Sequence, residues 1–288
     1  MPELPEVEAL AQDLRRHLDG RAIARVDIAA FSALKTFDPP LSAVNGLLVE
    51  DVSRHGKFLD ITGSGLHLVL HLSRAGWIRW RDTVPKLPPK PSNKSPLAAR
   101  VVLDDDSGLD ITEAGTQKRL ALYVVRDPFD VPGIQRLGPD PLADDFTIDV
   151  LRTILADAGR AQIKGVLRHQ GTIAGIGNAY SDELLHAAKM SPFKPASGID
   201  DDDLKVLYDA IRGVLGDAVE RSRGLAAAEL KGEKKSHLAV HGRKGASCPV
   251  CGDTVREVSF ADSALQYCPT CQTGGKPLAD RRTSKFLK

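Results

Sequence analysis

The sequence predicts an α+β protein with a leading helix, a β-rich domain of two packed sheets, a helical domain and a terminal ribbon. Three patterns support this fold class. Apolar residues recur at helical spacing at the start of the chain, short alternating apolar runs fill residues 21–136, and the helical period returns from about residue 147. With 288 residues and 42% hydrophobic content, the chain can bury a core in each of two domains.

The first segment, residues 2–19, has the pattern of an amphipathic helix. Its apolar face is made by Leu4, Val7, Leu10, Leu14 and Leu18. Pro2 suits the first turn because its missing N–H would have no partner there, while Glu3 and Glu6 meet the positive end of the helix dipole. Local structure alone therefore accounts for the opening Pro-Glu-Leu-Pro-Glu, and a chemical role for it must be argued from the rest of the chain.

The β-rich region, residues 21–136, is broken by one long loop. Alternation puts four leucines on one face of a strand: Leu66, Leu68, Leu70 and Leu72. Five prolines in residues 83–96 exclude a sheet ladder, so we expect an extended loop there. Proline and glycine flank acidic residues in the segment 137–146, which is typical of a linker. The domains expected are 1–136, 147–240 and 241–288, with the linker at 137–146.

The helical region contains a glycine-rich turn, GTIAGIGN at residues 171–178, followed by a helix expected at 179–189. A glycine-rich turn that opens a helix presents backbone N–H groups at the positive end of the helix dipole, which suits a phosphate. Asn178 lies at the mouth of this helix. From the sequence, its side chain could either cap the helix or donate a hydrogen bond to a phosphate.

Charge is distributed unevenly along the chain. Residues 221–288 hold 13 Lys and Arg against 6 Asp and Glu, a net charge of +7, whereas residues 1–220 carry a net charge of −6. A basic end is expected of a protein that contacts phosphates, although it is also compatible with a merely solvated face. No apolar run is long enough for a membrane span, and no signal peptide is recognised, so we expect a cytoplasmic protein with no membrane partner.

The four cysteines all fall near the end of the chain and are spaced Cys248-x2-Cys251-x16-Cys268-x2-Cys271. Two CxxC pairs on either side of a hairpin are the spacing of a four-thiolate zinc site. Disulfides are disfavoured because nothing indicates an oxidising compartment. We therefore expect one structural zinc ion, which folds the ribbon and takes no part in chemistry because four thiolates leave no open coordination position.

Three motifs together resemble those of the Fpg/Nei family of bacterial DNA glycosylases. They are PELPE at the start, GIGNAYSDELL in the middle, and the terminal segments HGRKGASCPVCG and YCPTCQTGGK. The resemblance covers the whole chain. It implies an N-terminal β-sandwich domain, a helix-two-turn-helix domain and a zinc ribbon. It also implies base-excision repair of double-stranded DNA with damaged bases or abasic sites, by a monomeric glycosylase with AP lyase activity.

The resemblance assigns chemistry to the opening motif. It implies that Met1 is removed and that the secondary amine of Pro2 attacks C1′ of the damaged nucleotide, forming a Schiff base. An α-amino group has a pKa of about 7.7–8.0 in model compounds, so part of it is neutral at physiological pH. Glu3 resembles the general acid that protonates the opening sugar, Glu6 would assist it, and Lys57 resembles a lysine that pairs with the phosphate beside the lesion.

The DNA-binding residues follow the family only in part. Lys164 and Asn178 match its phosphate contacts, and a flipped base implies side chains that fill the gap. Here the gap-filling loops offer Arg74 in HLSRAGW and Gln117, Lys118, Arg119 and Leu120 in TEAGTQKRLAL, which departs from the family pattern. Ser263 stands where an arginine of the ribbon is usual, so Arg281 or Arg282 of the basic tail would supply that contact.

Two other interpretations remain open at this stage. A binder of damaged or abasic DNA could keep the fold and lack base excision, as the altered gap-filling residues and Ser263 would allow. A zinc-ribbon module for RNA or protein would leave the N-terminal motif unexplained. Residues 222–238 are also shorter than the loop that closes over the damaged purine in guanine-repairing relatives, so we expect 8-oxoguanine to be a poor substrate.

Overall fold

The computed structural model describes residues 2–92, 94–115, 117–261 and 263–280, which fall into two compact units. The first unit comprises the chain up to Leu137 together with Arg221–Lys231, and the second comprises Gly138–Glu220 and the chain from Gly232 onward. Each unit has its own apolar core. The segment Arg221–Lys231 belongs to the first unit because Ala227 and Leu230 are buried in that unit's core.

The leading helix α1 spans Leu4–Leu18 and buries its apolar face in the core of the first unit. It begins at Leu4 because Glu3 keeps an extended backbone, with φ −121° and ψ −175°, and acts as the N-cap. Glu3 and Glu6 form a capping box in which the backbone N–H of Glu3 donates to Glu6 Oε2 at 2.8 Å. The two reciprocal bonds of the box give partners to N–H groups that a helix start otherwise leaves unpaired.

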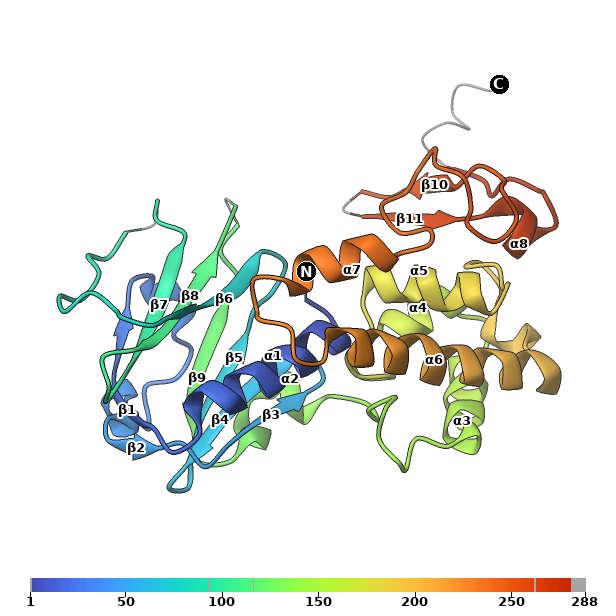
Figure 1. Ribbon diagram of the computed structural model, residues 1–288. Helices are drawn as coiled ribbons and strands as arrows, with labels where there is room; N and C mark the ends of the chain where they lie inside the picture. Colours follow the sequence, from blue (N-terminus) through green and yellow to red (C-terminus); the bar gives the residue numbers. More distant parts are fainter. Residues whose placement is uncertain (1, 93, 116, 262, 281–288) are drawn as a thin grey trace. The chain divides into compact units, whose positions relative to one another are not determined.

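The strands of the first unit form two antiparallel sheets around one core, as predicted (Figure 1). The five-stranded sheet has the order β2-β1-β7-β8-β6, formed by β1 Ala22–Ile28, β2 Leu47–Leu48, β6 Gly76–Arg81, β7 Leu97–Leu103 and β8 Gly108–Glu113. The four-stranded sheet has the order β3-β4-β5-β9, formed by β3 Asp51–His55, β4 Phe58–Gly63, β5 Leu66–His71 and β9 Ala121–Val125. Leu68, Leu70 and Leu72 are all buried in the shared core, which confirms the predicted leucine face.

The short helix α2, Pro132–Gln135, packs on the other face of the four-stranded sheet. Its Ile134 clusters there with Phe58 and Val69. A Cβ on Gly133 would lie 2.4 Å from the Phe58 ring, so this close approach requires glycine. Because Phe58 directly follows Lys57, the packing of α2 fixes the strand that begins beside that lysine.

The second unit is helical and ends in a two-stranded hairpin, as the sequence pattern predicted. Its elements are α3 Ile148–Ala158, α4 Ile163–Arg168, α5 Asn178–Ala187, α6 Asp201–Ser222, α7 Leu230–His237, β10 Arg256–Ser259, β11 Ala264–Tyr267 and α8 Pro269–Thr273. The last residues of α6 and the first of α7 are those assigned to the first unit. Short 3-10 turns occur along the chain at Phe31–Ala33, Leu41–Val44, Pro128–Asp130 and Ala196–Gly198.

Helix α5 ends at Ala187, two residues before the end that the sequence pattern indicates. Lys189 has a left-handed backbone, with φ +51°, which stops the helix. Within the described part of the chain, no helix combines the length and the apolar composition needed to cross a membrane.

The packing of α1 predicts the effect of one core substitution. Leu14 is 1% exposed and lies in the core that both sheets share. We expect Leu14→Ala to lower the free energy of unfolding by about 2–5 kcal/mol, because it loses apolar burial and leaves a cavity. Urea denaturation followed by circular dichroism measures the change. Val206→Ala on α6 is the control, since Val206 is 47% exposed and its truncation should change stability by less than about 0.5 kcal/mol; equal effects of the two substitutions would contradict the packing described.

Candidate functional site

Two buried carboxylates stand at the start of the chain. Glu3 and Glu6 are each 2% exposed, and Pro2, which precedes them, is also buried. The capping box holds Glu3 and Glu6 against each other, and the backbone N–H groups at the start of α1 provide a positive electrostatic potential around them. Pro2 thus directly precedes a buried carboxylate whose position at the start of the helix is fixed by a second one.

Lys57 lies in the tight turn between β3 and β4, where Gly56 has a φ of +56° and His55 pairs with Phe58. The side chain of Arg54 both joins this hairpin to α1 and closes its turn. Arg54 donates from Nε to Glu8 Oε2 at 2.9 Å and from Nη1 to the Gly56 carbonyl at 3.2 Å. Since Glu8 is on the first turns of α1, these bonds place the Lys57 turn relative to the helix that carries Glu3 and Glu6. Lys57 itself is only 8% exposed.

His71 is a neighbour of Lys57 that the sequence analysis did not identify. It lies on β5 opposite Phe58, and the centroids of the two rings are 4.5 Å apart. Burial, and then the positive charge of Lys57, lower the pKa of His71 to about 4. At physiological pH the imidazole is therefore neutral, so it can donate one hydrogen bond beside Lys57 without adding a second positive charge. The sequence pattern does not distinguish His71 from His67. Only the strand register shows that His71 lies opposite Phe58, next to Lys57.

Arg74 is exposed at the turn between β5 and β6. The preceding residue, Ser73, has a φ of +53°, a left-handed conformation that costs a residue with a side chain about 1 kcal/mol or more. The closing contact of the turn is tight, because a Cβ on Gly76 would lie 2.1 Å from the Leu72 carbonyl oxygen. A strained turn thus presents an arginine to solvent.

The β8–β9 loop is held by the buried carboxylate of Glu113. Its Oε1 accepts hydrogen bonds from the backbone N–H groups of Arg119 at 2.8 Å and Leu120 at 3.1 Å. The ammonium of Lys118 donates to the Glu113 carbonyl, while the side chain of Arg119 is exposed. Leu120 is 2% exposed and is part of the core, so the expectation that it could enter a DNA stack is wrong. Among residues 117–120, the exposed side chains are those of Gln117 and Arg119.

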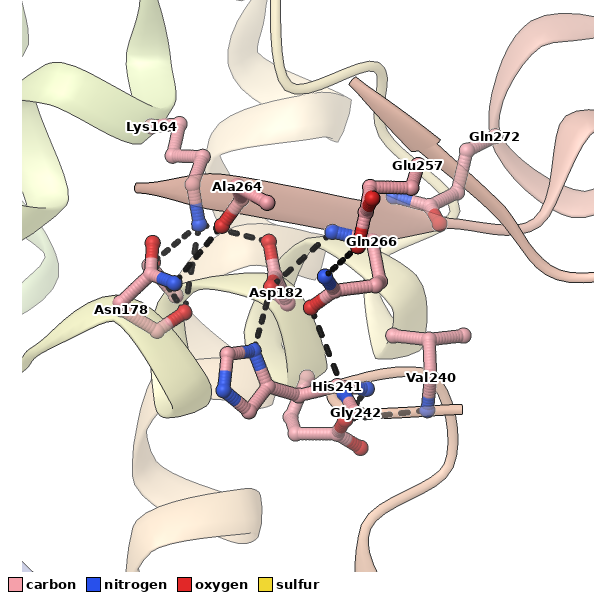
Figure 2. A network of polar contacts seen from close by, with 12 residues as sticks. Lys164, Asn178, Asp182, Val240, His241, Gly242, Glu257, Ala264, Gln266 and Gln272 are labelled. Atoms are coloured by element: carbon pink, nitrogen blue, oxygen red, sulfur yellow. Dashed lines mark hydrogen bonds and ion pairs between the residues drawn. The ribbon is translucent and has the colours of Figure 1, made fainter. Parts of the chain in front are cut away.

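Asn178 is the first residue of α5, and its side chain does not cap the helix. The N-cap is Gly177, and Asn178 Nδ2 instead donates to the carbonyl oxygen of Ala264 on β11 at 2.8 Å (Figure 2). Its Oδ1 is buried and accepts no hydrogen bond from the described residues. The capping alternative is therefore excluded.

Lys164 is buried and does not present its charge to solvent. Its ammonium donates to Asp182 Oδ1 at 2.5 Å, to Ser181 Oγ at 2.7 Å and to the Asn178 carbonyl at 3.2 Å (Figure 2). A lysine has three N–H donors, and these three acceptors use all of them. The expectation that Lys164 contacts a phosphate directly is thus at odds with the geometry, in which it holds the first turn of α5 together.

Two neighbouring acids of α5, Asp182 (Figure 2) and Glu183, bind the chain at and just before the ribbon. Asp182 Oδ2 accepts from His241 Nδ1 at 2.7 Å and from the backbone N–H of Gln266 at 3.2 Å. Glu183 accepts from three consecutive backbone N–H groups, those of Ala239, Val240 and His241. Desolvation is the main reason that the pKa of Glu183 is raised, with the charge of Asp182 adding to it and the three N–H donors opposing it.

The four cysteines form the predicted metal centre. One sulfur atom from each of Cys248, Cys251, Cys268 and Cys271 lies within 4.8 Å of all the others. The sulfur atoms of Cys251 and Cys268 are 3.3 Å apart and those of Cys248 and Cys271 are 3.9 Å apart, too far for disulfides. Tetrahedral zinc with bonds of about 2.3 Å places sulfur atoms roughly 3.8 Å apart, so the donor set fits one structural Zn²⁺. Desolvation raises the pKa of Cys268 to about 11, which a divalent cation would offset.

Two sequence expectations concern the ribbon and its tail. Ser263 lies in the β10–β11 turn, where its carbonyl accepts from the Phe260 N–H at 2.7 Å. No basic side chain stands at that position. Arg281 and Arg282, the predicted substitutes, lie outside the described residues, so their role stays a prediction.

Comparison with known proteins covers all three parts of the chain. Residues 1–119 match the formamidopyrimidine-DNA glycosylase N-terminal domain, residues 137–228 match its H2TH domain, and residues 247–274 match a zinc finger found in FPG and IleRS. A formamidopyrimidine-DNA glycosylase of Symbiobacterium thermophilum is 34% identical over 98% of this chain and 93% of its own.

Solved structures of formamidopyrimidine-DNA glycosylases also match nearly the whole chain. The crystal structure of the MutM (Fpg) protein from Thermus thermophilus has a TM-score of 0.80 and 31% identity, over 96% of this chain and all of the other. A complex between the Lactococcus lactis Fpg and DNA containing an abasic site has a TM-score of 0.82 and 25% identity, over 94% of this chain and 99% of the other.

The buried Lys164–Asp182 pair predicts a specific pattern of stabilities. We expect Asp182→Ala to lower the free energy of unfolding by about 3–5 kcal/mol, because it leaves the ammonium of Lys164 buried without its carboxylate. The double variant Lys164→Met, Asp182→Leu should lose less, since no unpaired charge remains. Chemical denaturation measures both. Asp209→Ala, which breaks the exposed Lys205–Asp209 pair, should have no measurable effect, and a double variant as unstable as the single one would contradict the role given to the pair.

The low pKa of His71 predicts a pH dependence of stability. Between pH 4 and about 6.5 the unfolded chain binds a proton at His71 that the folded chain does not, so the free energy of unfolding rises with pH in this window. The part due to His71 is on the order of 3 kcal/mol and is lost as pH falls toward 4. Denaturation of the wild type and of His71→Gln from pH 4 to 8 isolates it. Parallel curves for the two proteins would show that His71 is not held neutral.

Proposed function

The chain belongs to the Fpg/Nei family of base-excision-repair DNA glycosylases, and we propose that it removes damaged bases through a Schiff base on Pro2 and then cleaves the strand. The observation that carries the proposal is the buried Pro2–Glu3–Glu6 group at the start of α1. The family relationship supplies the precedent, and this geometry supplies the nucleophile beside a held carboxyl group.

The proposed reaction begins at the Pro2 nitrogen, which must be a free secondary amine, so the mature chain has lost Met1. The amine attacks C1′, the bond from C1′ to the base breaks, and the base leaves with a proton. Glu3 protonates O4′ as the sugar ring opens and an iminium forms between Pro2 and C1′. Loss of a proton from C2′ then expels the 3′ phosphate, and water later hydrolyses the Schiff base. The helix dipole of α1 disfavours a charged Pro2 and keeps the amine nucleophilic.

Phosphate binding is proposed for Lys57 in the first unit and Asn178 in the second. Lys57 supplies a positive charge, and neutral His71 next to it can donate a hydrogen bond to the same anion. Asn178 Nδ2 has a second N–H besides the one it gives to Ala264, and it stands where the α5 dipole is positive. Lys164 enters as the residue that positions Asn178 and not as a phosphate ligand.

Damaged-base recognition requires side chains that fill the space of the extruded nucleotide. We assign this role to Arg74 and Arg119, which are exposed on two turns of the first unit, with Lys118 supporting its loop.

Arg281 and Arg282 are proposed as phosphate contacts of the tail. The substrate class is double-stranded DNA with oxidised pyrimidines, ring-opened purines or abasic sites, and the protein acts as a monomer with one structural zinc ion.

Borohydride trapping tests the proposal. The protein is incubated with duplexes that carry an abasic site, 5-hydroxycytosine, ring-opened guanine or 8-oxoguanine, and the iminium is reduced to a stable covalent complex. We expect a trapped band with the wild type and none with Pro2→Gly, while Pro91→Gly in the exposed proline-rich loop should behave as the wild type. The intact mass of active protein should correspond to a chain that starts at Pro2.

Each result has a distinct meaning. No band on any duplex, together with tight binding to the abasic one, would identify a non-catalytic binder of damaged DNA. Active protein that retains Met1 would show that another amine is the nucleophile. A band that persists in Pro2→Gly would show only that the proline ring is not required, because Gly at position 2 still carries an α-amino group. The order in which the duplexes react gives the substrate preference, with 8-oxoguanine expected to react least.

A further inference from the structure

We propose that His186 is a positioning residue of the zinc centre, which donates a hydrogen bond from its ring to the Cys248 thiolate and so joins the metal to helix α5. His186 Nε2 lies 3.2 Å from Cys248 Sγ, a distance within the range for a hydrogen bond to sulfur. The two residues are 62 positions apart in the chain and come from different elements. This inference rests on the zinc site alone and is independent of the glycosylase chemistry.

The burial of both groups makes the contact specific. His186 is 5% exposed and Cys248 is 3% exposed, so water cannot easily replace either partner. A thiolate ligand has no proton to give, so the hydrogen must come from the histidine, and Nε2 must be the protonated nitrogen. A histidine that only filled the core would be expected to direct its ring N–H to a backbone carbonyl or water instead of a metal-binding sulfur.

The charge of the centre explains what such a bond contributes. Four thiolates around Zn²⁺ leave a net charge of −2 at a site where Cys248 and Cys268 are buried. Hydrogen bonds to the sulfur atoms spread this charge and orient the ligands, and loss of such a partner typically weakens metal binding by roughly 10–100-fold. His186 is therefore expected to strengthen zinc binding without contacting the metal.

The position of His186 on α5 connects the metal to the proposed DNA-binding residue. Asp182 and His186 are four residues apart and lie on one face of the helix, and both bind parts of the ribbon. Asn178 begins the same helix and is itself bonded to Ala264 of β11. The helix thus has contacts to the ribbon at its first turn, its middle and its last turn, and His186 provides the one that ends on a zinc ligand.

Two substitutions separate hydrogen bonding from packing. His186→Phe keeps an aromatic ring and removes the donor, whereas His186→Gln keeps an N–H at a similar reach. His237→Gln on α7 is the control, since its imidazole bonds only within its own helix among the described residues. Zinc transfer from each purified holoprotein to a chelating indicator is timed without DNA. We expect transfer roughly 10–100-fold faster for His186→Phe, and within a few-fold of wild type for His186→Gln and the control.

Cobalt provides a signature that packing alone would not change. In protein reconstituted with Co²⁺, the sulfur-to-metal charge-transfer band should shift in His186→Phe and return toward the wild-type position in His186→Gln. Wild-type zinc retention and an unchanged band in His186→Phe would overturn the proposal. Equal zinc loss in both variants with identical cobalt spectra would also overturn it, because the residue would then act only by filling space. Borohydride trapping does not enter this test, so failure of the proposed reaction leaves its outcome intact.

Discussion

The second unit depends on one buried carboxylate, that of Asp182, which has no exposed surface. It binds the ammonium of Lys164 on α4, the imidazole of His241 and the backbone of β11, so three segments distant in sequence meet at two oxygen atoms. A buried carboxylate is costly unless every lone pair has a donor, and here the donors are supplied by the elements that must be held. The position of Asn178, between α4 and β11, follows from this arrangement.

In the first unit, too, acidic side chains fix the positions of neighbouring segments. The Glu3–Glu6 capping box fixes the start of α1, and the Arg54–Glu8 bond fixes the turn of Lys57 to the same helix. Both interactions use acidic residues at the start of the chain. The positions of these carboxylates therefore determine where α1 begins and how the Lys57 turn is attached to it. The neutral state of His71 fits this design, because a second cation beside Lys57 would repel the first.

The zinc ribbon links the metal to the helix that bears Asn178. Glu183 binds three backbone N–H groups just before the ribbon, and His186 binds a cysteine sulfur within it. The ribbon is therefore attached to the helical core by three residues of one five-residue stretch of α5: Asp182, Glu183 and His186. Such attachment keeps β11 in place, and with it the Ala264 carbonyl that the Asn178 side chain binds.

Sequence patterns were enough to predict the fold class and the four cysteine ligands of the metal site. Helical and alternating periodicities and CxxC spacing are local signals, and they require no knowledge of which segments meet. Only the tertiary structure revealed the burial and the partners of Lys164, His71, Leu120 and His186. A buried lysine and an exposed one look alike in sequence, and so do a leucine in a loop and one in a core. Their burial and partners arise from strand register and helix packing, which join residues far apart along the chain.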